Sequence, residues 1–158
     1  MESATQELQA RFKEALSRFA AGVTVVSARL GEEERGMTAT AFMSLSLEPP
    51  LVALGIWHGA KVLPLLEASG AFWVSLLREG QEGVSEHFAG KPKEGVGLAE
   101  GRVAGALAVL HCRLEALYPG GDHRLVVGRV EAVELGEMGP PLVYYARGYR
   151  RLVWPSSG

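Results

Sequence analysis

Histidine and cysteine, which often carry metal or nucleophilic chemistry, are few and scattered in this chain. The four histidines, His58, His87, His111 and His123, lie in no H-E-x-x-H pattern and have no carboxylate at ligand spacing. No G-x-S-x-G sequence presents a nucleophilic serine on a tight turn. Cys112 is the only cysteine and lies among apolar residues, so we expect a buried, inert thiol. Metal and serine-hydrolase chemistry are therefore disfavoured.

The usual phosphate-binding loops are also missing from the sequence. Gly95, Gly97 and Gly101 approach the G-x-G-x-x-G fingerprint, but the third glycine comes one residue late and no predicted strand precedes them. Gly90-Lys91 is followed by proline instead of the serine or threonine of a P-loop. A reaction in which a bound cofactor such as flavin supplies the reactivity needs few protein acids and bases, and this sequence favours it.

The segment from Met37 to Ser44 has a composition suited to holding such a cofactor. Hydroxyl side chains alternate there with apolar ones: Met37, Thr38, Ala39, Thr40, Phe42 and Ser44. The hydroxyls can donate hydrogen bonds to ring edges, sugar hydroxyls or phosphate, on a loop that small residues keep open. The apolar members would lie beneath or beside a ring, although core packing alone would also explain Phe42. A solvated turn is the competing interpretation.

An amphipathic helix is predicted to precede this segment. Leu8, Phe12, Leu16 and Phe19 recur at helical spacing, with Ser3 or Thr5 available as a cap and Gly22 able to end the helix. Shorter helices are predicted at Lys61–Glu67 and Gln81–Phe88, and the stretch from Gly90 to Gly105 has the composition of a loop.

The remaining apolar runs are short and bounded by glycine or proline, which is typical of strands. We predict strands at 23–28, 45–47, 51–57, 72–77, 107–117, 124–135, 142–145 and 149–154. Turns are expected at Gly31–Glu34, Pro49-Pro50 and Pro119–Gly121, and a bulge near Ala132-Val133. Short strands at regular spacing with few helices predict a single, mainly β domain over residues 1–158, an antiparallel, Greek-key-like barrel with peripheral helices.

Composition excludes other classes of protein. The chain is 47% hydrophobic and 22% charged with a formal charge of -2, which is typical of a globular protein and gives no basic surface for nucleic acid. The longest apolar stretch, near Leu51–Trp57, is too short to cross a bilayer. Glu2 and Glu7 are atypical of a secretory signal, so we expect a cytoplasmic location and no membrane partner.

Six segments, in order along nearly the whole chain, resemble the short-chain flavin reductase family. They are Arg18–Val26, Gly36–Ser44, Ser46–Leu51, Phe88–Gly90, Gly121–His123 and Arg147–Leu152. The resemblance implies an FMN-binding split barrel, a homodimer, and reduction of FMN or FAD by NADH or NADPH. It also implies a separate oxygenase that uses the reduced flavin, of the aromatic, 4-hydroxyphenylacetate type.

The resemblance also implies roles for individual residues. The flavin would contact Met37, Thr38, Ala39, Thr40, Ser44, Leu45, Ser46, Trp57, Lys61, Phe88 and Lys91. The nicotinamide dinucleotide would contact His123, Arg147 and Tyr149. Lys61 and Lys91 can each attract a phosphate, or can be ordinary surface lysines. A flavin-binding or flavin-sensing protein without turnover is the alternative of another class.

Overall fold

The predicted amphipathic helix at the N-terminus is present. The structure, a computed structural model, describes residues 3–153. Helix α1 (Ala4–Leu16) begins with a capping box, in which the Ser3 hydroxyl accepts from the Gln6 amide at 3.1 Å and the Gln6 side chain accepts from the Ser3 amide at 2.9 Å. The helix ends at Leu16 with Ser17 as its C-cap, earlier than the predicted end at Gly22. Ala21–Gly22 instead forms a strand, β1, that pairs with Tyr144 and Val143 near the C-terminus.

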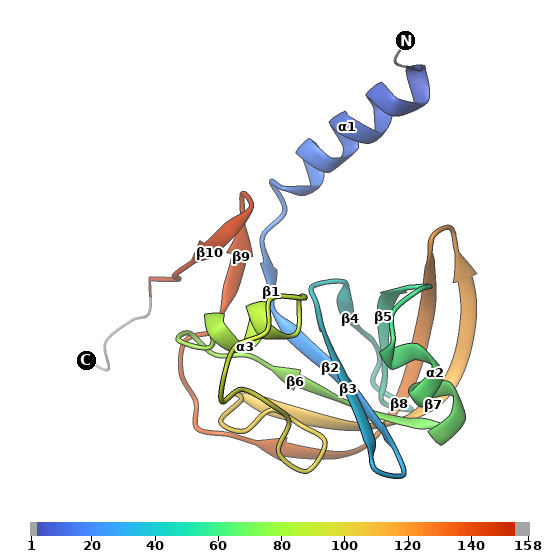
Figure 1. The fold of residues 1–158 in the computed structure, drawn as a ribbon, viewed down its shortest axis with the longest axis vertical. Coiled ribbons are helices and arrows are strands. Elements are labelled where there is room, and N and C mark those ends of the chain that lie inside the picture. Colours follow the sequence, from blue (N-terminus) through green and yellow to red (C-terminus); the bar gives the residue numbers. More distant parts are fainter. Residues whose placement is uncertain (1–2, 154–158) are drawn as a thin grey trace.

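A seven-stranded antiparallel sheet forms most of the molecule, in the order β3-β2-β6-β7-β8-β5-β4 (Figure 1). Its strands are β2 (Thr24–Leu30), β3 (Glu33–Ala39), β4 (Phe42–Ser46), β5 (Leu51–Trp57), β6 (Ala71–Leu76), β7 (Ala108–Gly120) and β8 (His123–Leu135). A second sheet, in the order β1-β9-β10, contains β9 (Val143–Tyr145) and β10 (Gly148–Arg150). The mainly β, antiparallel prediction is confirmed, and the large sheet is an open barrel because its edge strands β3 and β4 do not pair with each other.

The segment predicted as an open hydroxyl loop is instead mostly strand. Residues up to Ala39 continue β3, and Phe42 already begins β4, so only Thr40 and Ala41 form the connection. Threonine and small residues are compatible with strand geometry, and edge strands tolerate them well. Because β3 and β4 are the two edges of the open sheet, this two-residue link joins its opposite ends.

Two short helices pack on the sheets. Helix α2 (Val62–Ser69) buries Val62, Leu63, Leu65 and Leu66 in the main core inside the curved sheet. Helix α3 (Glu82–His87) lies beside a smaller core made by Val23, Val25, Leu77, Val103 and Leu142, against which Phe88 and Tyr149 also pack. The segment between α3 and β7 has no named helix or strand, as predicted.

The β7–β8 hairpin differs slightly from its prediction. Pro119 and Gly120 still pair with Arg124 and His123. The turn therefore lies at Gly121–Asp122, slightly later than the predicted turn at Pro119–Gly121. The predicted bulge is present one residue early: His111 pairs with Ala132 and Cys112 with Val130, which leaves Glu131 as the extra residue.

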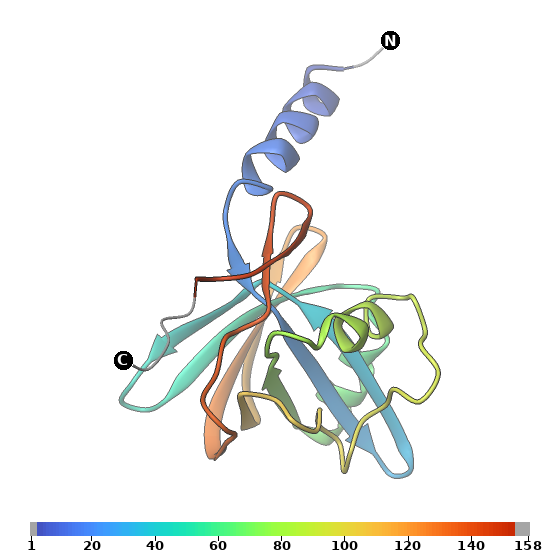
Figure 2. The ribbon, with the colours of Figure 1, turned by 90° about the vertical axis from the view of Figure 1, so that its left-hand side faces the viewer.

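Helix α1 projects away from both sheets (Figure 2). None of its residues is buried, and the side chains of Leu8, Phe12 and Leu16 are 69%, 62% and 50% exposed. An isolated helix of this length is marginally stable in water, so its apolar stripe lacks the packing that normally stabilises such a helix. Among the described residues, no helix is long and apolar enough to cross a membrane.

Gly128 tests the tight packing inside the sheet. A Cβ at this position would lie 2.4 Å from Cζ of Phe72 and 3.2 Å from Cβ of Cys112. We expect Gly128→Ala to lower the free energy of unfolding by about 1–3 kcal/mol, measured by chemical denaturation. Gly83→Ala, on α3 with nothing within 4 Å, is the control and should not destabilise. A Gly128→Ala protein as stable as wild type would contradict this packing.

Candidate functional site

Two adjoining grooves open where the ends of the large sheet meet the small sheet and α1. The larger, which we call the α1 groove, has a volume of about 880 Å³ and is mainly apolar. It is lined by the C-terminal end of α1, the Thr40–Met43 segment, β5 and β9, with side chains that include Leu16, Phe19, Met43, Leu125, Tyr144 and Tyr145. Its size falls in the range of ordinary small-molecule sites.

The second groove, which we call the Tyr149 groove, has a volume of about 440 Å³ and is more polar. Thr38, Thr40, Ser85, Lys91 and Tyr149 contribute to its lining. Thr40, Tyr144 and Arg147 line both grooves, so the two form one continuous depression with an apolar end and a cationic end.

A set of hydrogen bonds fixes the wall of the Tyr149 groove. The Thr38 hydroxyl donates to the backbone carbonyl of Ser85 at 2.6 Å, and the Thr38 amide donates to the carbonyl of Phe88 at 3.1 Å. The Tyr149 hydroxyl donates to the hydroxyl of Ser85 at 2.7 Å. These bonds join β3, α3 and β10, which are far apart in sequence, around one groove.

The β9–β10 turn holds Arg147 at the junction of the grooves. Its two central residues, Ala146 and Arg147, have φ values of 52° and 59°, an unusual conformation for residues other than glycine. The Ala146 amide donates to the carbonyl of Ser17 at 2.8 Å, and Arg147 pairs with Glu14 at 3.0 Å. The hydrogen bond from Arg147 lowers the pKa of the Glu14 carboxyl. The turn is thus attached to the end of α1.

His123 lies beside the α1 groove without lining it. It pairs with Trp57 across the β5–β8 ladder, and its ring lies near Gly55, which lines the groove. Its Nδ1 lies 2.8 Å from a carboxylate oxygen of Asp122, and this hydrogen bond lowers the pKa of Asp122. The imidazole is thereby oriented by its neighbour while its side chain stays 45% exposed.

The structure brings together some of the predicted site residues. Five line the depression: Thr38, Thr40, Lys91, Arg147 and Tyr149. His123 borders it, whereas eight lie outside the lining of both grooves: Met37, Ala39, Ser44, Leu45, Ser46, Trp57, Lys61 and Phe88. The side chains of Met37 and Ala39 pack with the main core, and the Phe88 ring packs against Gly36. Any ligand contact from Ala39, which is buried, would have to come from its backbone.

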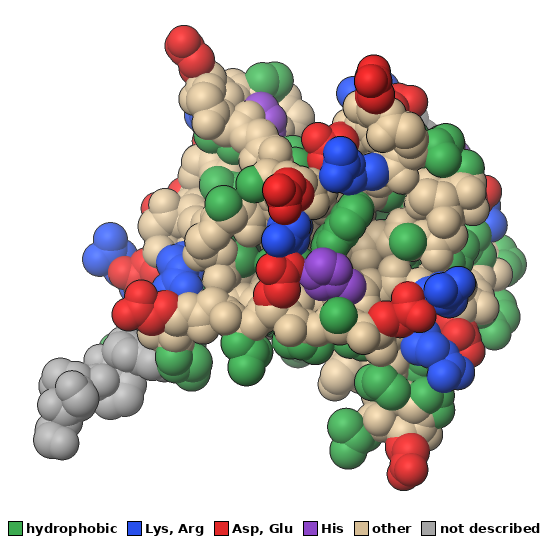
Figure 3. Space-filling view, turned by 90° about the horizontal axis from the view of Figure 1, so that it is seen from below, with side chains coloured by type: hydrophobic (Ala, Val, Ile, Leu, Met, Phe, Trp, Pro, Cys, Tyr) green, Lys and Arg blue, Asp and Glu red, His purple; other side chains and the backbone are tan. Residues whose placement is uncertain are grey.

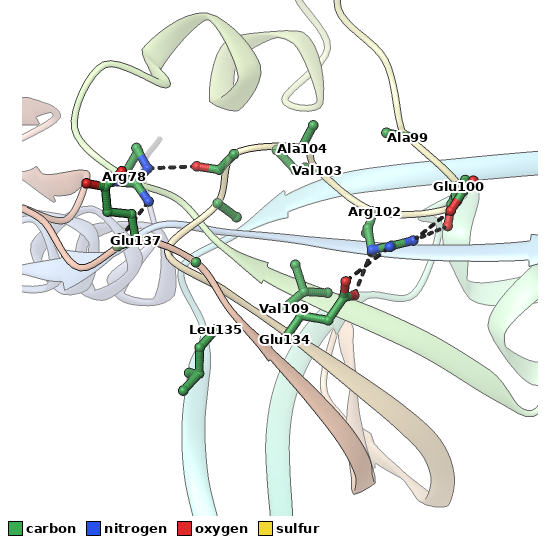
Figure 4. Close-up of a pocket in the computed structure, with 13 residues that line it drawn as sticks. Arg78, Ala99, Glu100, Arg102, Val103, Ala104, Val109, Glu134, Leu135 and Glu137 are labelled. Atoms are coloured by element: carbon green, nitrogen blue, oxygen red, sulfur yellow. Dashed lines mark hydrogen bonds and ion pairs between the residues drawn. The ribbon is translucent and has the colours of Figure 1, made fainter.

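A third depression of about 810 Å³ lies under the segment from Ala99 to Gly105, away from these residues (Figure 4). Its two guanidinium groups are already used by the protein. Arg78 donates to the carbonyls of Gly105 and Glu137, and Arg102 pairs with Glu134 at 2.7 Å. These bonds hold the Ala99–Gly105 segment in place and leave few donors for a ligand, so we interpret the network as structural.

The end of the molecule opposite α1 has no concentrated charge. Acidic and basic side chains are interspersed there (Figure 3), in agreement with paired groups such as Arg29 with Glu34 and Arg102 with Glu134. In contrast, no ion pair among the described residues involves Lys91, so its ammonium remains available at the Tyr149 groove. An anionic ligand would be favoured at that end of the depression.

The residues present fit a flavin together with a dinucleotide. β4 is an edge strand, so part of its backbone N–H groups face away from β5 and can donate to the edge of a ring. Apolar and aromatic side chains line the space beside it. Lys91 supplies positive charge for phosphate, and Arg147, which also pairs with the exposed Glu14, can add to it. No group of three or more histidine, cysteine or carboxylate side chains is placed to hold a metal ion within residues 3–153.

Comparison with known proteins agrees with this geometry. Residues 16–153 match the model of the flavin reductase like domain. The chain belongs to this family. It is 81% identical, over 92% of its length and 97% of the relative, to the reductase component of 4-hydroxyphenylacetate 3-monooxygenase from Thermus thermophilus. It is 43% identical to an NADH-dependent flavin reductase from Rhodococcus, over 89% of this chain and 84% of that protein.

The fold also agrees with solved flavin reductases. The NADH:FAD oxidoreductase of Streptomyces globisporus, solved in complex with NAD and FAD fragments, superposes with a TM-score of 0.85 at 33% identity, over 97% of this chain and 98% of that one. The split-barrel interpretation of the open seven-stranded sheet is consistent with this likeness.

Several residues that line the depression were missed from the sequence, among them Ser85, Tyr144 and Phe19. Phe19 and Tyr144 carried only an apolar or strand signal, which is equally typical of core residues. Ser85 lies in a short helix, and its partner Tyr149 is 64 residues away, so no local pattern indicates their contact.

Cys112 tests the prediction that the one thiol takes no part in chemistry. Burial, with a smaller effect of the Glu131 charge, raises the pKa of Cys112 to about 12. Because the thiolate is the reactive form, we expect a disulfide reagent at mildly alkaline pH to leave the folded protein unmodified. One thiol per chain should react after unfolding in guanidinium. Rapid modification of the folded protein would contradict the burial.

Proposed function

We propose that this protein is a flavin reductase that transfers a hydride from NADH or NADPH to FMN or FAD. The observation that carries the proposal is the two-part depression, apolar beside β4 and cationic beside Lys91 and Arg147. Family membership and the names of the relatives support the same activity. The activity does not require acid–base groups in the depression, since hydride transfer needs alignment of the two ligands more than proton transfer by side chains.

The proposed task of the protein is to align two flat ligands and exclude water between them. A bound flavin supplies the acceptor for the hydride. The edge of β4 and the Thr40 hydroxyl would hold the ring, with Met43 and Leu125 beside it. Backbone N–H groups of the Met37–Ser46 segment would favour negative charge at the ring edge. The side chains of Ser44, Leu45 and Ser46, together with Trp57 and Lys61, remain proposed flavin contacts beyond the groove.

The second ligand would lie across the junction of the grooves. Arg147 would attract its phosphates, and Tyr149 and His123 remain proposed contacts of the dinucleotide. Lys91, in the same groove, remains a proposed contact of the flavin phosphate. Met37, Thr38, Ala39 and Phe88 would shape the flavin side chiefly by supporting the wall, because their side chains are packed or hydrogen-bonded within the protein.

The direct test measures loss of NADH absorbance by the purified protein with and without added flavin. We expect rapid oxidation only when FMN or FAD is supplied, in at least one of the four combinations of NADH or NADPH with FMN or FAD. Lys91→Gln should raise the KM for the flavin about 2–5-fold, because it removes a positive charge proposed to attract the flavin phosphate. Arg35→Gln is the control, because it also removes one positive charge, while Arg35 and its partner Glu33 line neither groove. Flavin binding without any turnover would indicate a sensor and contradict the proposal.

We further propose that a second copy of this chain covers α1. The apolar stripe of Leu8, Phe12 and Leu16 is largely exposed in the monomer, and at Leu16 it continues into the apolar wall of the α1 groove. A 13-residue helix without buried side chains needs such a partner to be stable in water. Two copies related by a two-fold axis would bury both stripes at once.

Phe12→Glu tests this dimer by placing a charge in the stripe. We expect the variant to run as a monomer in size-exclusion chromatography with light scattering, whereas wild type runs as a dimer. Ala10→Glu, on the opposite side of α1, is the control and should remain a dimer. A monomeric wild-type protein, or a dimeric Phe12→Glu variant, would contradict the proposal.

The reduced flavin is proposed to serve a separate oxygenase, an aromatic hydroxylase of the 4-hydroxyphenylacetate type. The relative from Thermus thermophilus is named as the reductase component of such an enzyme. The open form of the groove suits a flavin that leaves after reduction and diffuses to the oxygenase. A cytoplasmic location is part of this proposal, and the single, buried, free cysteine is compatible with a reducing compartment.

A further inference from the structure

Ser85 has an unusual position for a serine. It lies in α3 with only 2% of its surface exposed, yet serine favours helices less than alanine does. Alanine would fit the same buried space without a polar atom. Burying the Ser85 hydroxyl therefore costs free energy of folding, and its hydrogen bonds offset this cost.

Those hydrogen bonds connect Ser85 to two opposite walls of the Tyr149 groove. Its hydroxyl accepts from the hydroxyl of Tyr149 on β10 at 2.7 Å. Its backbone carbonyl accepts from the hydroxyl of Thr38 on β3 at 2.6 Å. The only part of this arrangement that depends on the serine side chain is the contact with Tyr149.

Within residues 3–153, the other contacts of the Tyr149 side chain are made by its ring. The ring packs edge-on against Tyr144, with centroids 5.6 Å apart and planes at 72°, and against the smaller core. Because the Tyr149 hydroxyl donates its proton to Ser85, the phenol oxygen remains able to accept a hydrogen bond from a ligand. Both Ser85 and Tyr149 line the groove, so this remaining capacity lies beside the space for a ligand.

We propose that Ser85 is a positioning residue that acts through Tyr149 on binding of the nicotinamide dinucleotide. This inference rests on the proposed function. Ser85 fixes the phenol at the groove wall, so that the dinucleotide meets an oriented hydroxyl. It does not act on the flavin, because the Thr38 contact uses the Ser85 backbone and persists in an alanine variant.

A double-mutant cycle tests this role, with Ser85→Ala, Tyr149→Phe and the double variant. Each single substitution removes the same neutral hydrogen bond and should raise the NADH KM about three- to tenfold, with little change in flavin affinity. The double variant should raise KM no further than Tyr149→Phe alone, because Ser85 then has nothing left to orient. Flavin affinity is measured by quenching of flavin fluorescence.

Ser75→Ala is the matched control for general destabilisation. Ser75 is likewise fully buried, and its hydroxyl accepts from the amide of Val103 at 3.1 Å, away from the grooves. It should lower the melting temperature and leave the NADH KM unchanged.

Two results would overturn the role of Ser85. One is an NADH KM for Ser85→Ala equal to that of the wild type. The other is a rise in NADH KM, on adding Ser85→Ala to Tyr149→Phe, as large as the rise that Ser85→Ala causes in the wild type. If Ser85→Ala does not fold, an unchanged KM in Tyr149→Phe alone would overturn it. If the wild-type protein shows no flavin-dependent NADH oxidation, the proposed function itself is contradicted.

Discussion

The open seam of the large sheet is the constraint on which the site depends. β3 and β4 are consecutive in the chain but lie at opposite edges of a seven-stranded sheet, so the sheet must curve until Thr40 and Ala41 can bridge its ends. The bridge is held by hydrogen bonds from the Phe42 amide to Thr40 and from the Gly55 amide to Ala41, both 2.9 Å. The two edges do not pair, and the grooves open where they diverge.

The small sheet turns this seam into a site. β9 and β10 cross its open end, where Tyr144, Arg147 and Tyr149 face the space left by the edges. Their position depends on three contacts from distant segments: Glu14 and Ser17 hold the turn, and Ser85 holds Tyr149. A shallow depression built in this way can align two flat ligands without enclosing them, which suits a reductase whose product must leave.

Local patterns in the sequence predicted most of the elements but not their edges. The amphipathic period of α1, the β-branched runs and the proline and glycine boundaries act within a few residues, so the helices and most strands were correct. The Thr38–Ser44 segment was interpreted as a loop, because its composition does not reveal that β3 and β4 each lack a neighbour on one side. Gly121–Asp122 became the turn because the β7–β8 register pairs Pro119 with Arg124, which depends on the whole ladder.

The site was predicted in part for the same reason. Thr38, Thr40 and Lys91, together with Arg147 and Tyr149, were found through their resemblance to a family pattern, and they line one depression. Ser85 was missed because its role comes from a contact across the fold.

A crystal structure with FMN bound tests the seam most directly. The account predicts the flavin ring beside Thr40 and the edge of β4, in the α1 groove. A ring bound under the Ala99–Gly105 segment, between Arg78 and Arg102, would contradict it.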